Sequence, residues 1–365
     1  MLLNAADKAL WRLALPMIFS NITVPLLGLV DTAVIGHLDS PVYLGGVAVG
    51  ATATSFLFML LLFLRMSTTG LTAQAWGAKD PQRLARALVQ PLALALGAGV
   101  LIILLRLPLI DLALHIVGGS EAVLEQARRF LEIRWLSAPA SLANLVLLGW
   151  LLGVQYARAP VILLVVGNLL NIVLDLWLVM GLRMNVQGAA LATVTAEYAT
   201  LIIGLLMAKR VLTLRGVSLA MLKNAWRGDL RRLLALNRDI MLRSLLLQLC
   251  FGALTVFGAR LGSDIVAVNA VLMTMLTFTA YALDGFAYAV EAHSGQAYGA
   301  RDGSQLLEVW RAACRQSGMV ALAFALIYSL AGQYIIALLT SLPSLQQLAD
   351  RYLIWQTILP VVGVW

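Results

Sequence analysis

The chain has 365 residues, of which 61 % are hydrophobic and 12 % are charged, and its formal net charge is +8. Soluble domains contain about 45–50 % apolar and about 25 % charged residues, so this composition excludes an ordinary soluble protein. Several stretches carry no charge over the length of about 20 residues that spans a bilayer; they are residues 40–64, 87–105, 135–157 and 316–349. The sequence therefore predicts an all-α protein that crosses a membrane many times.

The hydropathy pattern predicts ten apolar helices. They cover residues 9–36, 42–73, 87–116, 124–155, 159–182, 186–208, 234–261, 265–297, 307–340 and 346–365. Lysine and arginine gather in alternate loops, and loops of this kind stay in the cytoplasm. We therefore expect a cytoplasmic N-terminus. A nucleic-acid partner is not expected, because the basic runs are short and confined to loops.

The first predicted helix contains an acid, Asp31, six residues after Pro25. A charge at bilayer depth costs about 2.5–3.5 kcal/mol on insertion scales, so an intramembrane carboxylate is a candidate functional group. Proline removes an N–H from the helix, and interrupted helices beside ionisable groups form ion sites in secondary transporters. The alternative is a hydrogen-bonded aspartate near a helix end that reaches the membrane interface.

Three polar residues, Asn168, Asn171 and Asp175, share one face of the fifth predicted helix because they recur every three to four residues. The Asn171 amide can donate to the carboxylate of Asp175. With Asp31 on a neighbouring helix, two close carboxylates would form a proton or Na⁺ site. Thr193 in the sixth helix adds a hydroxyl, or bonds its own backbone. The alternative is a structural polar clamp between helices.

The polar segment 213–233 separates an N-terminal six-helix lobe, 1–212, from a C-terminal lobe, 234–365. The heptapeptide QAWGAKD that begins at Gln74 returns as QAYGARD at Gln296. Both copies have the same orientation, which predicts parallel halves related by a pseudo-two-fold axis, with a site between or inside them. By the same offset we expect the second lobe to be incomplete, with about ten of twelve helices present.

In the second half, Asp284 and Glu291 lie seven residues apart, on one face of the eighth predicted helix. Together with Asn168 they are candidate contacts to a substrate, although Glu291 is equally compatible with the membrane interface. The three histidines are far apart in the sequence, so no metal site is expected. The chain contains no phosphate-binding glycine loop and no nucleophile motif, and an enzyme is therefore not expected.

Three motifs together resemble the multidrug and toxic compound extrusion family, and a bacterial branch of it in particular. They are GLVDTAVIGHL around Asp31, the QAWGAKD and QAYGARD pair, and NLLNIVLDLWLVMGL followed by VQGAALAT. The resemblance implies two six-helix lobes in a V, and export of organic cations or other toxic compounds driven by H⁺ or Na⁺. It assigns cation coupling to Asp31, Asn171, Asp175 and Thr193, and implies that Pro25 bends the first helix on protonation.

An antiporter is therefore the expected function, with H⁺ or Na⁺ as the coupling ion and no other cofactor. We expect a cationic or amphipathic small molecule as substrate, the bacterial inner membrane as location, and a monomer. A flippase for lipid-linked substrates is one alternative, although such a cavity would carry several basic residues and here only Arg65 and Arg106 are deep. A non-transporting scaffold is another. Asp31 aligns with Ala253 in the repeat, so its carboxylate is not part of the shared scaffold.

Overall fold

The computed structural model describes residues 4–38, 40–228, 230–340 and 342–365; within these ranges the side chains of residues 22–32, 255, 259, 263 and 266 are not described. The described residues form helices, and no β-strand occurs among them. The α-helices are α1 (Ala5–Gly36), α2 (Pro41–Leu60), α3 (Phe63–Gly77), α4 (Pro81–Leu104), α5 (Arg106–Val117), α6 (Glu121–Arg134), α7 (Ala138–Gly153), α8 (Arg158–Asp175), α9 (Asn185–Leu214), α10 (Leu219–Asn224), α11 (Leu230–Leu261), α12 (Ser263–Gly299), α13 (Gly303–Leu339) and α14 (Pro343–Gly363). Two short helices of other types are the 3₁₀ turn η1 (Trp135–Ser137) and the π-helical turn η2 (Leu176–Gly181).

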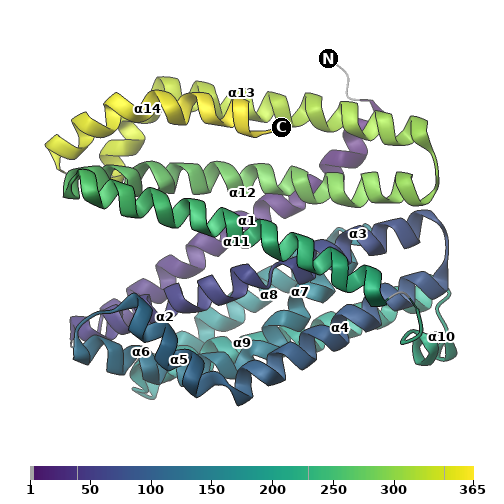
Figure 1. The fold of residues 1–365 in the computed structure, drawn as a ribbon, viewed down its shortest axis with the longest axis horizontal. Helices are drawn as coiled ribbons and strands as arrows, with labels where there is room; N and C mark the ends of the chain where they lie inside the picture. The colour runs from purple at the N-terminus through teal and green to yellow at the C-terminus, as the bar shows by residue number, and fades with distance from the viewer. Residues whose placement is uncertain (1–3, 39, 229, 341) are drawn as a thin grey trace.

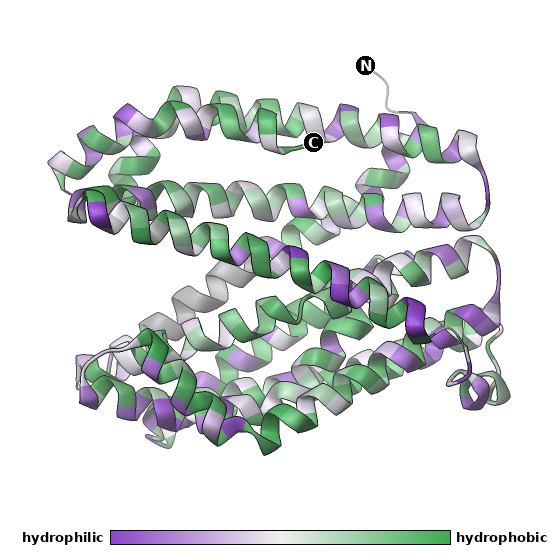
Figure 2. Cartoon of the chain, in the orientation of Figure 1, coloured by the Kyte–Doolittle hydropathy of each residue, from purple (hydrophilic) through white to green (hydrophobic). Residues whose placement is uncertain are grey.

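Eight helices or helix pairs within the described residues are long and apolar enough to cross a membrane. They cover Pro41–Gly77, Pro81–Leu104, Glu121–Gly153, Arg158–Gly181, Asn185–Leu214, Leu230–Gly258, Ala267–Gly299 and Gly303–Leu339. Figure 2 shows hydrophobic residues over most of the length of these helices. The prediction of an all-helical chain with several helices of membrane-spanning length is confirmed for the described residues.

The helices form two groups, with α12, α13 and α14 on one side and α2 to α9 on the other (Figure 1). The largest apolar cluster joins α2 to α9 around Trp150, together with the end of α1 at Ile35. A second cluster holds α12, α13 and α14 together around Met275. The first half of α1 packs instead with α7, α12 and α13, through Met17 and Phe286. α1 therefore connects the two groups of helices.

Several predicted helices are broken, and the prediction of continuous helices over 42–73, 87–116 and 124–155 was wrong. In the third of these, Pro139 occupies the first turn of α7, where its missing N–H costs no helical hydrogen bond. The preceding turn at η1 tightens to a 3₁₀ helix before α7 begins. In the polar segment 213–233, α9 extends to Leu214 and α10 forms a short helix of its own.

The two heptapeptide copies fold into the same turn. In each, the basic residue adopts a positive φ, 53° at Lys79 and 55° at Arg301. The aspartate N–H then donates back to the helix, from Asp80 to Ala75 at 3.2 Å and from Asp302 to Ala297 at 3.1 Å. This bond closes a Schellman-type helix end, and each aspartate side chain caps the next helix. The sequence repeat is therefore also a local structural repeat.

The same copies pack directly against each other where α3 and α12 end. A Cβ added to Gly77 would lie 1.9 Å from the carbonyl oxygen of Gln296, and one added to Gly299 would lie 2.0 Å from that of Gln74. Each copy thus supplies both a glycine and a carbonyl group. Only glycine permits this approach, because any side chain would enter the partner's backbone. We call this contact the glycine crossing.

Candidate functional site

A polar cluster lies between α8 and α9, inside helices that are otherwise apolar. Asn171 and Asp175 are buried, with exposed fractions of 5 % and 1 %. The Asn171 amide donates to the Thr193 hydroxyl across a distance of 3.3 Å, and Thr193 in turn donates to the carbonyl of Ala189 at 3.2 Å. The sequence predicts Asp175 as an acceptor of this amide, and the structure shows the Thr193 hydroxyl on the neighbouring helix as an acceptor. The Thr193 hydroxyl therefore bonds both to its own helix backbone and to Asn171.

The side-chain oxygen of Asn171 is buried, and among the described residues it accepts no hydrogen bond. A buried polar atom without a partner costs free energy, so such an atom in a native structure calls for a ligand or an exchangeable partner. An amide oxygen beside a carboxylate is a suitable ligand for a proton-bearing group or for Na⁺. The arrangement therefore fits cation binding better than bond chemistry.

Asp175 ends α8, and the helix continues as the π-helical turn η2. In this turn the N–H of Leu182 donates to the carbonyl of Trp177 over 2.9 Å, five residues earlier. π-Helical turns are rare and occur often at functional sites. The predicted helix over 159–182 thus forms as one continuous span, but its last turn is π-helical and not α-helical. Because the wider turn follows Asp175 directly, it sets the direction of the helix beyond this carboxylate.

The remaining predicted coupling residues lie in α1, which packs against both α8 and η2. Asp31 and Pro25 belong to this helix, but their side chains fall outside the described residues. Asn168 is half-buried on α8, one turn before Asn171. The structure thus places the helix that carries Asp31 beside the helix that carries Asn171 and Asp175.

Sequence reasoning missed one acid in this region, Glu197. The amide of Asn144 on α7 donates to the Glu197 carboxylate at 3.0 Å and to its backbone carbonyl at 3.1 Å. Glu197 follows Thr193 by four residues and so lies on the same face of α9. The signal was available, because Glu197 is the one charged residue of the predicted helix 186–208. The polar cluster between α8 and α9 therefore extends along α9 to Asn144 on α7.

A second polar cluster connects α3 to α12. Arg65 is buried, with a side chain that is 4 % exposed, and its guanidinium lies 3.4 Å from the carboxylate of Glu291. The same guanidinium stacks over the ring of Tyr288, 4.1 Å from its centre, which adds a cation–π attraction. Tight packing positions Arg65, since a Cβ on Gly149 of α7 would lie 2.5 Å from the Arg65 carbonyl oxygen.

The ion pair shows what surrounds Glu291. Its side chain is 29 % exposed and faces Arg65, so it belongs to the contact between α3 and α12. Asp284, two turns earlier on α12, is exposed, and Arg65 and Arg243 both act on it electrostatically. The two acids that share a helix face therefore differ: one is held by an arginine, and the other stays accessible.

No metal centre is indicated within the part of the chain that the structure describes. No group of three or more His, Cys, Asp or Glu side chains there could hold a metal ion. The acids instead pair with amides or arginines, as at Glu197 and Glu291.

Comparison with known proteins identifies the family of this architecture. The MatE family model matches residues 16–177 and 240–363. The chain is 87 % identical over 363 residues to the DNA damage-inducible protein F of Escherichia coli K12, a match that covers 100 % of this chain and 79 % of that protein. It is 29 % identical over 196 residues to a probable multidrug resistance protein NorM of Thermotoga maritima, covering 52 % of this chain and 42 % of the relative.

Solved structures show the same fold. A crystal structure of MATE in the straight conformation superposes with a TM-score of 0.88 at 24 % identity, over 99 % of this chain and 80 % of that one. An outward-facing multidrug resistance MATE family transporter of the MOP superfamily gives a TM-score of 0.83 at 25 % identity, with the same coverage. The resemblance inferred from the motifs is confirmed. The chain belongs to the MatE family of multidrug and toxin efflux transporters, which are multi-pass membrane proteins and not enzymes.

Proposed function

We propose that this protein is a secondary active antiporter that exports organic cations or other toxic amphipathic molecules in exchange for H⁺ or Na⁺. The observation that carries the proposal is the cluster of buried Asn171 and Asp175 with half-buried Thr193, in which the Asn171 oxygen accepts no hydrogen bond from the described residues. Buried ionisable and amide groups inside apolar helices are costly, and in transporters they mark ion pathways. The names of relatives such as NorM, a probable multidrug resistance protein, support the substrate class.

In the proposed cycle, Asp31 and Asp175 bind the coupling ion. Protonation from outside weakens their hold on a bound cation and favours its release, and deprotonation towards the cytoplasm resets the site. Pro25 serves as the hinge of α1, which contacts both groups of helices. A shape change in α1 would then reach both groups together.

The substrate is proposed to bind near Asn168 and Asp284, with Glu291 at the edge of the site. Asp284 is accessible, whereas a substrate cation at Glu291 would compete with the Arg65 guanidinium for the carboxylate. Arg65 thus serves as an internal cation that occupies Glu291 between transport events. The exporter would work as a monomer of two six-helix lobes in the bacterial inner membrane, with a cytoplasmic N-terminus.

A flippase for a lipid-linked or amphipathic substrate is the second candidate. The observation in its favour is the presence of Arg65 and Arg243 near Asp284, since basic side chains can hold an anionic headgroup. A scaffold role would give no reason for an Asn171 oxygen that lacks a partner among the described residues.

The experiment is dye efflux from everted membrane vesicles energised by a proton gradient, with a parallel series driven by Na⁺. We expect Asp31→Asn, Asp175→Asn and Asn171→Leu each to reduce efflux at least tenfold, while Asp350→Asn, an exposed acid on α14, leaves it unchanged. Undiminished coupled efflux in the Asp175→Asn protein would refute the coupling role. Lipid translocation without any ion-driven efflux would favour the flippase, and the absence of both would favour a scaffold.

A further inference from the structure

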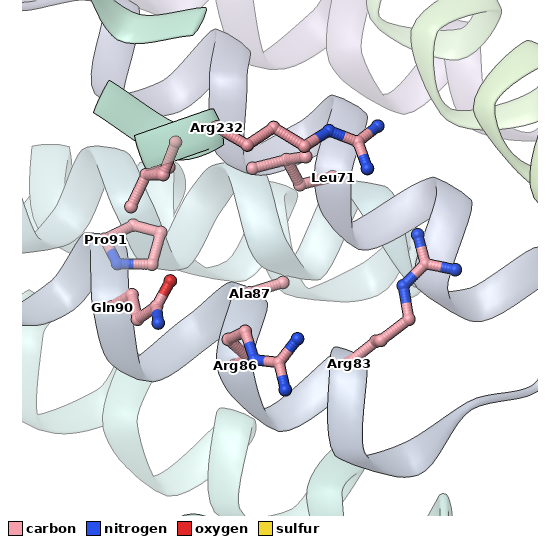
Figure 3. A pocket seen from close by; sticks show the side chains of 8 residues that line it. Leu71, Arg83, Arg86, Ala87, Gln90, Pro91 and Arg232 are labelled. Carbon is pink, nitrogen blue, oxygen red and sulfur yellow. The ribbon is translucent and has the colours of Figure 1, made fainter. Parts of the chain in front are cut away.

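Two adjoining cavities open at the end of the molecule where the glycine crossing lies. The smaller, about 70 Å³, lies between α3, α4 and α11 and is lined by Arg83, Arg86 and Arg232 over the apolar side chains of Leu71 and Leu233. The larger, about 480 Å³, shares two of these arginines and extends to the turn between α12 and α13. Figure 3 shows Arg83 and Arg86 on α4, with Arg83 extending towards the side from which Arg232 approaches on α11.

The charge lining these cavities is strongly unbalanced. Arg301 joins the other arginines at the larger cavity, and the acid that lines it is Asp302. The Asp302 carboxylate is already engaged by the backbone N–H of Gln305 and the hydroxyl of Ser304. Within the described residues, Arg83, Arg86 and Arg301 form no ion pair; Asp229, in the adjacent segment, lies outside them.

Arg86 gives an independent indication of a ligand. Its Nε atom is buried and has no hydrogen-bond acceptor among the described residues. The guanidinium is held against the backbone of Gly228, where an added Cβ would lie 2.2 Å from Nε. A buried guanidinium N–H without an acceptor is costly. Because Arg86 lines the smaller cavity, its guanidinium group is within reach of an oxyanion that enters there.

We propose that these cavities bind a phosphate oxyanion, carried by the headgroup of an anionic phospholipid or present as free phosphate. Guanidinium groups bind phosphate oxygens with paired, charge-assisted hydrogen bonds, and basic pockets between helices near the membrane surface hold anionic headgroups. The apolar floor at Leu71 and Leu233 suits the start of a lipid chain. A bound phosphate contacts α4, α11 and the turn after α12 together, and so stabilises the conformation with the glycine crossing closed.

The experiment measures the melting temperature of the purified protein in detergent. One series adds dioleoyl-phosphatidylglycerol, with phosphatidylcholine at the same mole fraction as reference. The other adds sodium phosphate in phosphatidylcholine micelles, with sodium chloride at matched ionic strength. We expect the melting temperature of the unmodified protein to rise with ligand concentration and then to saturate. In Arg83→Gln and Arg86→Gln, the ligand concentration that gives half of this rise should increase about tenfold or more, because a charge-assisted contact is lost.

The matched control is Arg311→Gln, which removes the same charge from an exposed position near the start of α13 and should respond as the unmodified protein does. If the arginine substitutions weaken the response to phosphatidylglycerol, the phosphate belongs to a lipid headgroup; if they weaken the response to sodium phosphate, it is free phosphate. Equal responses in Arg83→Gln, Arg86→Gln and Arg311→Gln would overturn the site, as would a lack of response in the unmodified protein. If Arg86→Gln does not fold, Arg83→Gln decides the result, since its side chain makes no hydrogen bond within the described part.

Discussion

Replacement of Gly77 by alanine tests the glycine crossing directly. The new methyl carbon would lie 1.9 Å from the Gln296 carbonyl oxygen, 2.7 Å from the carbonyl carbon and 2.9 Å from its Cα. Ordinary van der Waals contact begins at 3.4 Å. Because all three atoms belong to the backbone, no side chain can rotate to make room, and α3 and α12 must move apart.

The size of the effect follows from this geometry. Excess volume in a packed interior costs about 1–3 kcal/mol, and a backbone neighbour places Gly77→Ala at the upper end of that range. A penalty of this size that acts only on the crossed conformation shifts its population by about 5- to 150-fold. We therefore expect both a lower melting temperature and a larger share of molecules in which these helix ends are separated.

Spin labels on the two equivalent turns report this separation. Lys79 and Arg301 are exposed and can be replaced by labelled cysteines after the native Cys250 and Cys314 are changed to serine. The distribution of distances between the two labels should be narrow in the protein that retains Gly77. It should broaden towards longer distances in Gly77→Ala. Gly70→Ala is the matched control, because a Cβ at this position of α3 would meet nothing within 4 Å.

The reciprocal variant sharpens the test. Gly299→Ala should reproduce the effect, since its methyl group would lie 2.0 Å from the carbonyl oxygen of Gln74. The double variant should cost less than the sum of the two, because both changes separate the same pair of helices. If Gly77→Ala gives the same distances and the same melting temperature as Gly70→Ala, the reasoning is refuted.

Two further predictions concern Glu291 on α12 and Asp302, the N-cap of α13. Glu291→Gln leaves the buried Arg65 without its counter-charge and should cost about 1–3 kcal/mol in the free energy of unfolding. The double variant Glu291→Gln with Arg65→Met should lose less than the sum of the two single variants. Additive losses would show that the two side chains do not interact. The pKa of Asp302 lies below its ordinary value because the N–H of Gln305 and the hydroxyl of Ser304 donate to the ionised carboxylate. Its cap on α13 is thus fully present above about pH 4 and is lost as pH falls through the lowered pKa. Hydrogen exchange at Gln305, corrected for the intrinsic rate, should show less protection below that pH, and no such change in Asp302→Asn; unaltered protection in the unmodified protein would contradict the assignment.

Much of the architecture is readable from local patterns. Apolar runs of membrane-spanning length locate the helices, and the recurrence of polar residues every three to four positions places Asn171 and Asp175 on one buried face. The heptapeptide repeat is visible in the sequence, and its two copies fold into the same turn, with a positive φ at Lys79 and Arg301. These features depend only on residues that are close in the chain.

The missed features depend on how distant helices meet. Arg65 and Glu291 are separated by 226 positions, and nothing in either helix alone specifies the other as partner. The spacing on α8 predicts Asp175 as an acceptor of the Asn171 amide, whereas Thr193, the acceptor that the structure shows, lies on α9 and reaches Asn171 through the packing of the two helices. Helix breaks such as the one between Leu60 and Phe63 are set by packing as well, since no proline or glycine marks them.

The glycine crossing also bears on the origin of the chain. In a two-fold symmetric dimer, each contact occurs twice: residue i of the first subunit touches residue j of the second, and residue j of the first touches residue i of the second. Gly77 on the Gln296 carbonyl and Gly299 on the Gln74 carbonyl follow this rule within one polypeptide. An ancestral half-length protein could therefore have formed the crossing between two identical subunits before gene fusion. Asp31, by contrast, aligns with Ala253, a difference that became possible only once the two halves could mutate separately.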